Sequence, residues 1–129
     1  MVEFVVNTFN NIVYKACERY GKEEGVEATK MQVLFKLDDE GEVEYSILKN
    51  YTPFKDVTFN EILNVRIDFR MYSQIVPPFI QNTILTYGEK LEANPNELMV
   101  MCVVTGVNKV VLFLYKDKKP IEEIILEEL

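Results

Sequence analysis

The chain contains no histidine, so carboxylates, lysines, arginines, tyrosines and two cysteines are the side chains that could carry chemistry. Without histidine, Ser–His and Cys–His nucleophile pairs and His-ligated metal centres are excluded. The glycines are scattered and fit neither a phosphate-binding loop nor a dinucleotide-binding fingerprint. Because the sequence shows no known catalytic motif, we expect a non-enzymatic protein that uses no cofactor.

Acidic residues gather in the first half of the chain, at Asp38, Asp39, Glu40, Glu42 and Glu44. Clustered carboxylates can hold Ca²⁺ or Mg²⁺ weakly, but the spacing is not that of an EF-hand loop. A solvated hairpin tip is the favoured interpretation, since exposed charges discourage strand-to-strand aggregation. The functional alternative is an acidic surface for a basic partner protein, such as a nucleic-acid-binding protein whose phosphate ligand it imitates.

Arg66, Arg70 and Tyr72 recur at even spacing around Asp68. Arginine makes bidentate contacts with carboxylates and phosphates, so these residues could line an anion-binding or nucleotide-binding pocket. A ladder of ion pairs between neighbouring strands is the favoured interpretation. We therefore expect structural roles for Arg66 and Arg70.

Composition and charge limit the class of protein further. A net charge of −7 over 129 residues opposes direct binding to nucleic acid. Cys17 and Cys102 each fall on an apolar pattern, which predicts buried free thiols. Glu3 and the interrupted apolar spacing around it argue against a signal peptide and a membrane span. We expect a cytoplasmic protein that folds as a single domain over residues 1–129.

The most continuously apolar stretch, residues 97–116, contains two runs of β-branched and aliphatic side chains around Gly106-Val107-Asn108. This pattern predicts a hairpin, with Asn108 in the left-handed conformation and Val104 opposite Val110. Both faces of the predicted hairpin are apolar. An antiparallel hairpin of this kind requires cover on both faces.

Alternating apolar residues predict another hairpin between residues 31 and 48, with a loop at Asp39-Glu40-Gly41. Placing Gly41 at positive φ pairs Leu37 with Val43, which keeps the alternating apolar set on one face. The pattern therefore determines the register of this hairpin.

The opposite face of this first hairpin carries Leu34 and Leu48, with Lys36 opposite Glu44 as a cross-strand ion pair. The two leucines continue one apolar face of the 97–116 hairpin, and the later helix offers only a narrow stripe to shield that face. Soluble monomers seldom expose a contiguous apolar patch larger than a few hundred Å². We therefore expect Leu34 and Leu48 to lie in the interface of a homodimer.

Two helices are predicted in the parts of the chain that precede residue 64. An amphipathic pattern over residues 2–20 predicts the first helix, with Gly21 just beyond its end. Thr58 and Glu61 have the spacing of a capping box, which predicts a brief second helix.

The remaining segments are predicted from changes of period. Residues 51–56 break the strand pattern, and a period of two over residues 65–72 predicts a third strand, with a continuing helix as the alternative. A helix is expected from Pro77-Pro78 to residue 91, and Pro120 is expected to open a final helix.

This order of elements predicts an α+β domain with an antiparallel sheet of about five strands, two hairpins plus one strand, covered by helices. The order loosely resembles that of small roadblock-like or profilin-like domains, and this resemblance of architecture implies no function. The predicted function is a small acidic adaptor or inhibitor that covers a partner protein's surface. The alternative is a small anionic-ligand or nucleotide-binding domain that uses Arg66, Arg70 and Tyr72.

Overall fold

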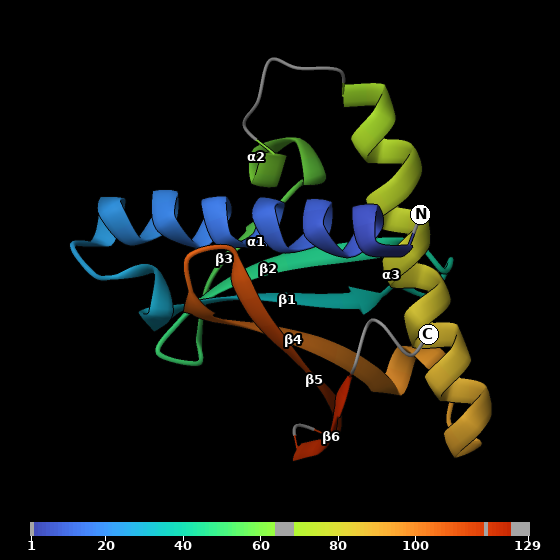
Figure 1. The fold of residues 1–129 in the computed structure, drawn as a ribbon. Coiled ribbons are helices and arrows are strands. Elements are labelled where there is room, and N and C mark those ends of the chain that lie inside the picture. The colour runs from blue at the N-terminus through green and yellow to red at the C-terminus, as the bar shows by residue number, and fades with distance from the viewer. Residues whose placement is uncertain (1, 64–68, 118, 125–129) are drawn as a thin grey trace.

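The computed structural model describes residues 2–63, 69–117 and 119–124 of the chain (Figure 1). Within these residues, six antiparallel strands form one sheet in the order β3-β2-β1-β4-β5-β6. The strands are β1 Met31–Leu37, β2 Val43–Lys49, β3 Thr52–Val57, β4 Leu98–Gly106, β5 Lys109–Lys116 and β6 Lys119–Ile124. The helices are α1 Val2–Glu24, α2 Phe59–Leu63 and α3 Phe69–Leu91, with short 3₁₀ turns η1 Ala28–Lys30 and η2 Pro95–Glu97. The fold is α+β as predicted, with six strands in place of about five.

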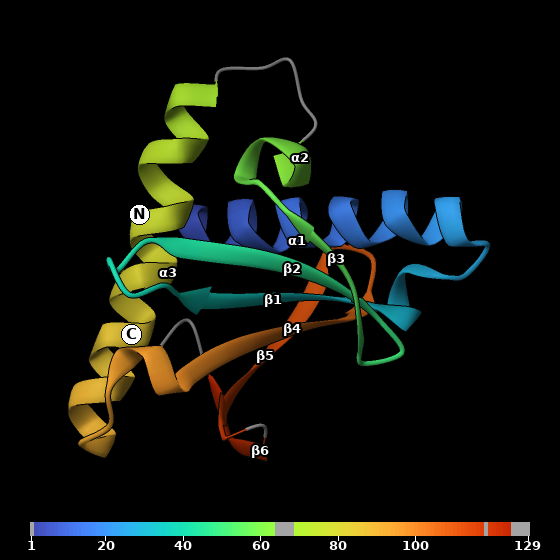
Figure 2. The same cartoon turned by 180° about the vertical axis from the view of Figure 1, so that it is seen from behind.

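Helices α1 and α3 pack on the same face of the sheet. Figures 1 and 2 show α1 lying along the strands and α3 lying crosswise to it near the N-terminus. The ring of Phe9 on α1 lies 5.7 Å from that of Phe35 on β1 and 5.7 Å from that of Phe79 on α3. The packed core therefore lies between one sheet face and both long helices. The expectation that the later helix would shield the other face is wrong.

Both predicted hairpins have the predicted register. Leu37 pairs with Val43 and Val104 pairs with Val110. Gly41 has a φ of 82°, which L side chains rarely adopt and which explains why glycine occupies this loop position. Side-chain parity determines the pairing of the first hairpin, because a slip of one residue would exchange its apolar and polar faces. The hairpin of β4 and β5 is apolar on both faces, so alternation alone fixes its register only weakly.

Helix α1 continues past Gly21, so the predicted end of this helix is wrong. The Val26 N–H donates to the Gly21 carbonyl at 2.9 Å, and a Cβ on Gly21 would lie 2.7 Å from the Val26 carbonyl oxygen. Gly21 thus permits a close approach of the backbone that follows the helix. Gly25, with a φ of 71°, is the left-handed residue that follows the helix end.

The capping box at the start of α2 is confirmed. The Glu61 N–H donates to Thr58 Oγ1 at 3.2 Å, and the Thr58 N–H donates to Glu61 Oε1 at 3.3 Å. These reciprocal bonds satisfy backbone donors that have no partner within a helical first turn. Local side-chain chemistry therefore begins this helix at the predicted residue.

The third strand predicted over residues 65–72 is wrong for residues 69–72, which belong to α3, and residues 65–68 lie outside the described residues. Helix α3 also continues through Pro77-Pro78, where the prediction placed a helix start. Proline removes a helical hydrogen bond and disfavours helix in the preceding residue. Burial of Val76 and Ile80 in the core offsets this local cost.

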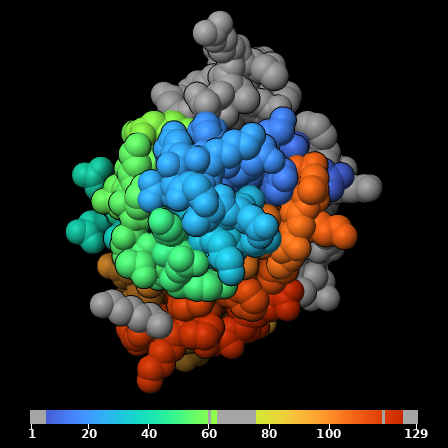
Figure 3. All heavy atoms as spheres, turned by 90° about the vertical axis from the view of Figure 1, so that its left-hand side faces the viewer, coloured from blue at the N-terminus to red at the C-terminus, as the bar shows by residue number. Residues whose placement is uncertain are grey.

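The two edge strands were not predicted. Residues 52–57 form β3, and residues 119–124 form β6 where a final helix was expected, while residues 125–129 lie outside the described residues. The three-residue spacing of Ile121 and Ile124 suits a helix, but pairing with β5 satisfies the backbone of this segment instead. In Figure 3, β3 (green) and β6 (red) both reach the surface on one side of the molecule.

Cys17 and Cys102 are free and fully buried, as predicted. Burial raises the pKa of the Cys17 thiol to about 12, and burial followed by the neighbouring Cys17 raises the pKa of Cys102 well above its ordinary value. Both thiols therefore stay protonated in the folded protein and act as small apolar side chains.

Candidate protein-interaction surface

The sheet has a second face, turned away from α1 and α3, which we term the open face. Paired residues on neighbouring antiparallel strands point to the same side, so the strand register determines which side chains lie on this face. One row across it, ordered from β3 to β6, consists of Asp56, Ser46, Leu34, Met101, Phe113 and Glu123. The rows on either side contain Glu44, Lys36, Met99 and Tyr115, and Leu48, Gln32, Val103 and Val111.

We term the apolar side chains of these rows the apolar patch: Leu34, Leu48, Met99, Met101, Val103, Val111, Phe113 and Tyr115. Leu48 and Met101 are 3% and 6% exposed, and the other members are partly exposed. None of the patch residues belongs to the packed core between sheet and helices or packs against it. Among the described residues, the patch therefore lies outside the core that the sheet forms with α1 and α3.

The position of the apolar patch follows from the strand sequences. On β1 and β2, the positions that face away from the helices include the polar residues Lys36, Glu44 and Ser46. On β4 and β5, the corresponding positions from Met99 to Val103 and from Val111 to Tyr115 are all apolar. The patch is therefore concentrated on β4 and β5 and extends onto β1 and β2 through two leucines.

The span of the patch lies just below the usual size of functional apolar surfaces. Each residue on one face of a sheet occupies about 33 Å², because strands are about 4.8 Å apart and same-face residues about 6.8 Å apart. The eight patch residues then span about 260 Å² of flat sheet, of which Leu48 and Met101 contribute little accessible area because they are buried. Apolar patches of roughly 300–600 Å² on monomers often mark interaction sites.

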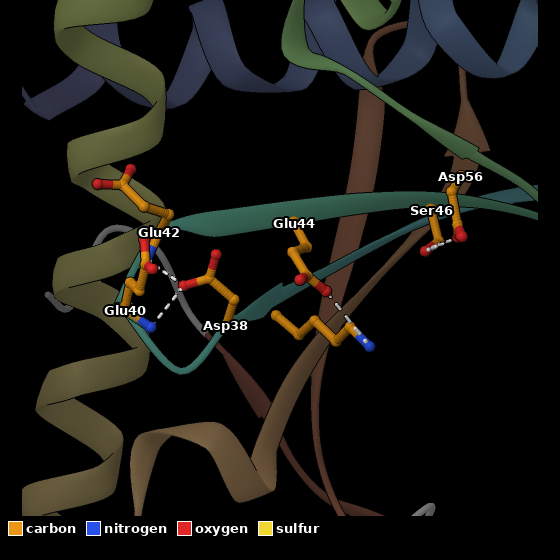
Figure 4. A network of polar contacts seen from close by, with 7 residues as sticks. Asp38, Glu40, Glu42, Glu44, Ser46 and Asp56 are labelled. Atoms are coloured by element: carbon orange, nitrogen blue, oxygen red, sulfur yellow. Dashed lines mark hydrogen bonds and ion pairs between the residues drawn. The ribbon is translucent and has the colours of Figure 1, made fainter.

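Carboxylates flank the apolar patch on both sides. Figure 4 shows Glu44, Ser46 and Asp56 on the side of the sheet away from α1. Ser46 Oγ donates to Asp56 Oδ1 at 2.9 Å, and Lys36 Nζ lies 3.4 Å from Glu44 Oε2. On the far side of the patch, Glu123 is paired with Phe113 in the strand register. The flanks of the open face are therefore acidic, with one lysine already paired to a glutamate.

A cleft of about 490 Å³ lies where β2 and β3 meet α2, beside this acidic flank. Asp56 and the Lys36–Glu44 pair line it together with Tyr45 and Phe59, whose rings are stacked 5.6 Å apart. Burial, and secondarily the nearby Glu42 carboxylate, raises the pKa of Tyr45, so its hydroxyl stays protonated. Carboxylates above an aromatic wall suit a long basic side chain, because its stem is apolar and its end is charged.

The acidic loop singled out in the sequence is not a single site. The Asp38 carboxylate accepts hydrogen bonds from the Glu40 and Glu42 N–H groups, both at 2.9 Å, so it stabilises the turn. Asp39, Glu40, Glu42 and Glu44 are exposed, and Figure 4 shows Asp38, Glu40 and Glu42 at the turn with Glu44 farther along β2. Among the described residues, no group of three or more His, Cys, Asp or Glu could hold a metal ion.

Only part of the predicted anion site falls on a described element. Arg70 and Tyr72 lie in the first turn of α3, and Arg66 lies outside the described residues. The ion-pair ladder between strands is therefore wrong for Arg70, because a helical segment has no cross-strand neighbours, and Arg66 and Asp68 lie outside the described residues.

Leu34 and Leu48, the predicted interface residues, do lie on the open face, but the sequence prediction did not identify its acidic flanks. Asp56 was assigned to an irregular segment and Glu123 to a helix, so neither could be placed in a sheet row. The available signal was the apolar character of both faces of the 97–116 hairpin, which indicated an uncovered face but not its neighbours.

No protein-family model, no curated protein and no solved structure matches the chain. None of these comparisons supports the resemblance to roadblock-like or profilin-like domains, which rested on the predicted order of elements. Within the described residues, no helix is both long enough and apolar enough to cross a membrane. The function must be inferred from the geometry of the open face.

Proposed function

We propose that the protein is a small non-enzymatic interaction module that binds a basic partner protein through the open face of its sheet. The observation that carries this proposal is the apolar patch, which crosses the middle of the sheet while both long helices pack on the other side. Burying apolar surface lowers the free energy by about 25 cal/mol for each Å², and a patch left in water does not gain this stabilisation. A partner that covers the patch recovers this free energy.

The shape of the surface favours a protein over a small molecule. Small-molecule sites are concave and enclose most of their ligand. The apolar patch lies on one face of a sheet, where the side chains of four neighbouring strands stand side by side. No observation in the described residues favours the alternative of an anionic-ligand pocket at Arg66, Arg70 and Tyr72.

The charge of the surface indicates what kind of protein fits. The chain has a net charge of −7, and Glu44, Asp56 and Glu123 flank the patch. Flanking charges raise the rate of encounter with an oppositely charged surface and disfavour wrong partners. A homodimer through Leu34 and Leu48, expected from the sequence, would bring a second charge of −7 to the same interface. We therefore favour a basic partner over a second copy.

Site-specific photo-crosslinking in the native cells tests the proposal. One variant carries a photo-reactive phenylalanine analogue at Phe113, in the patch, and a matched variant carries it at Lys15, an exposed position of α1. We expect the Phe113 variant to form an adduct with a defined basic protein that the Lys15 variant does not form. The purified partner should then bind the protein, and Phe113→Ser should weaken that binding about tenfold or more.

Identical adducts from both positions, or adducts from Lys15 alone, would show that the open face is not the binding surface. Binding of the purified partner that is unchanged by Phe113→Ser, with the fold intact by circular dichroism, would have the same meaning. An adduct between two copies of the chain would show that the open face forms a homodimer instead of binding a partner protein.

A further inference from the structure

We infer that the part of the partner that docks on the apolar patch is a cationic amphipathic helix lying along β4 and β5. This inference rests on the proposed function and specifies the chemistry of its partner. Three observations support it: the protected edges of the sheet, the dimensions of the patch and the charges beside the patch.

The sheet edges are protected against addition of a strand. Pro53 lies in β3 and Pro120 in β6, and proline cannot donate to a new strand. The pairing of each edge strand is also irregular, between Ile47 and Leu48 for β3 and between Leu114 and Tyr115 for β6. Prolines and bulges are common protections of an edge. The face of the sheet is therefore the surface that remains open to a partner.

The dimensions of the patch match those of one helix. Its rows run from Met99–Tyr115 through Met101–Phe113 to Val103–Val111, two row steps that span about 14 Å. A helix rises about 5.4 Å per turn and is about 10 Å wide, so two to three turns would cover the length of the patch and about two strands. With one further turn at each end, the docking helix has about 15–18 residues.

The chain itself uses this arrangement on its other face. Helix α1 runs along the sheet with an apolar side that includes Phe9, Val13 and Cys17, all buried against the strands. An amphipathic helix is thus a suitable cover for strands of this length. The open face presents apolar positions of β4 and β5, strands that α1 also contacts from the other side, without such a cover in the described residues.

The charges beside the patch determine the sign of the helix flanks. A helix over β4 and β5 has Glu123 on β6 along one side. On the other side Lys36 on β1 is paired with Glu44 on β2, and Asp56 on β3 lies beyond them. Lysine and arginine side chains can lie along apolar surface and extend their charge to such carboxylates. The cleft beside Glu44 and Asp56, of about 490 Å³, has room for one of them. An acidic amphipathic helix would be repelled by Glu123 and by the net charge of −7.

Three synthetic peptides of about 18 residues test the inference on the full chain. The first is an amphipathic Leu/Lys helix, the second a scrambled peptide of identical composition, and the third an amphipathic Leu/Glu helix. Fluorescence anisotropy measures the affinity of each labelled peptide. We expect the Leu/Lys helix to bind about tenfold or more tightly than either control, and its affinity to fall as salt rises from about 0.05 to 0.5 M.

Matched variants locate the binding surface. Phe113→Ser should reduce the affinity for the Leu/Lys helix about tenfold. Leu85→Ser removes an apolar side chain of α3 that is 43% exposed but lies outside the patch, and it should leave the affinity unchanged. Asp56→Asn and Glu123→Gln together should reduce the affinity several-fold and flatten its salt dependence, since they remove flanking charge while retaining shape.

Each other outcome overturns the inference in a distinguishable way. Equal binding of the Leu/Glu and Leu/Lys helices, both sensitive to Phe113→Ser, would refute the cationic chemistry while leaving the open face as a docking surface. Equal binding of the scrambled peptide would refute the helix. No peptide binding, with self-association that Phe113→Ser abolishes, would assign the patch to a second copy. No peptide binding without self-association would refute the inference, while the crosslinking experiment would still decide the proposed function.

Discussion

Replacing Leu114 by alanine should destabilise the fold by about 3 kcal/mol, whereas replacing its neighbour Phe113 should cost only about 1 kcal/mol. Leu114 is 0% exposed and belongs to the core between sheet and helices, so its truncation leaves a cavity. Phe113 faces the open side and pairs with Met101 and Glu123, so its truncation mainly exposes neighbours that are already near water. Phenylalanine is the larger side chain, and the order of the two costs is therefore opposite to the order of size.

Urea unfolding followed by far-UV circular dichroism measures both costs. The slope of the unfolding free energy against urea concentration should be the same for the parent and both variants, which keeps the comparison within two-state unfolding. Each protein is measured at a low and a high concentration. The unfolding midpoint of a monomer with an open face does not depend on protein concentration, whereas that of a dimer does.

Two results would refute the reasoning. A cost for Phe113→Ala as large as that for Leu114→Ala, at both concentrations, would mean that other parts of the same chain cover the open face. A cost that is large only at high concentration would mean that a second copy covers it. In either case the apolar patch would not be available to a partner protein.

Three further perturbations test local features of the fold. Gly41→Val should lower stability by about 1–2 kcal/mol in thermal or urea unfolding, because a φ of 82° strains a branched side chain. Gly21→Ala should also destabilise, by about 1 kcal/mol or more, although alanine is the better helix former, because its Cβ would lie 2.7 Å from the Val26 carbonyl oxygen; an unchanged or raised melting temperature would contradict that geometry. Burial raises the pKa of Cys17 to about 12, so alkylation of Cys17 and Cys102 at pH 8 should be slow until urea unfolds the chain. Burial raises the pKa of the folded Cys17 thiol above its ordinary value of about 8.5, so its contribution to the free energy of unfolding is fully present below that pH. The contribution is lost as pH rises from there towards 12.

Features determined by short-range side-chain patterns could be predicted from the sequence. Alternation of apolar and polar residues specified the pairing of Leu37 with Val43, since any shift of one residue would bury Lys36 and expose Phe35. The spacing of Thr58 and Glu61 specified the start of α2 through two reciprocal hydrogen bonds. In each case the physical cause lies within a few residues along the chain or directly across a tight turn.

Features determined by tertiary packing could not be predicted in the same way. Pro77-Pro78 indicated a break, but α3 gains more from burying Val76 and Ile80 than it loses in backbone hydrogen bonds. Ile121 and Ile124 suited a helix, but the exposed backbone of β5 offered this segment a strand partner. Both errors arise because the competing interaction lies far away along the chain.

The open face combines these two situations. The sequence of β4 and β5 is apolar in both parities, and this alone requires cover on both sides of the sheet. The strand sequence does not specify whether the cover over the open face comes from the same chain. Because α3 lies beside α1, no described helix covers the open face. Because Lys36, Glu44 and Ser46 interrupt the apolar rows on β1 and β2, the unmet requirement is a strip about two to three strands wide rather than the entire face. A strip of that width suits a single helix better than another six-stranded sheet, which would bury the Lys36–Glu44 pair and place two acidic flanks against each other.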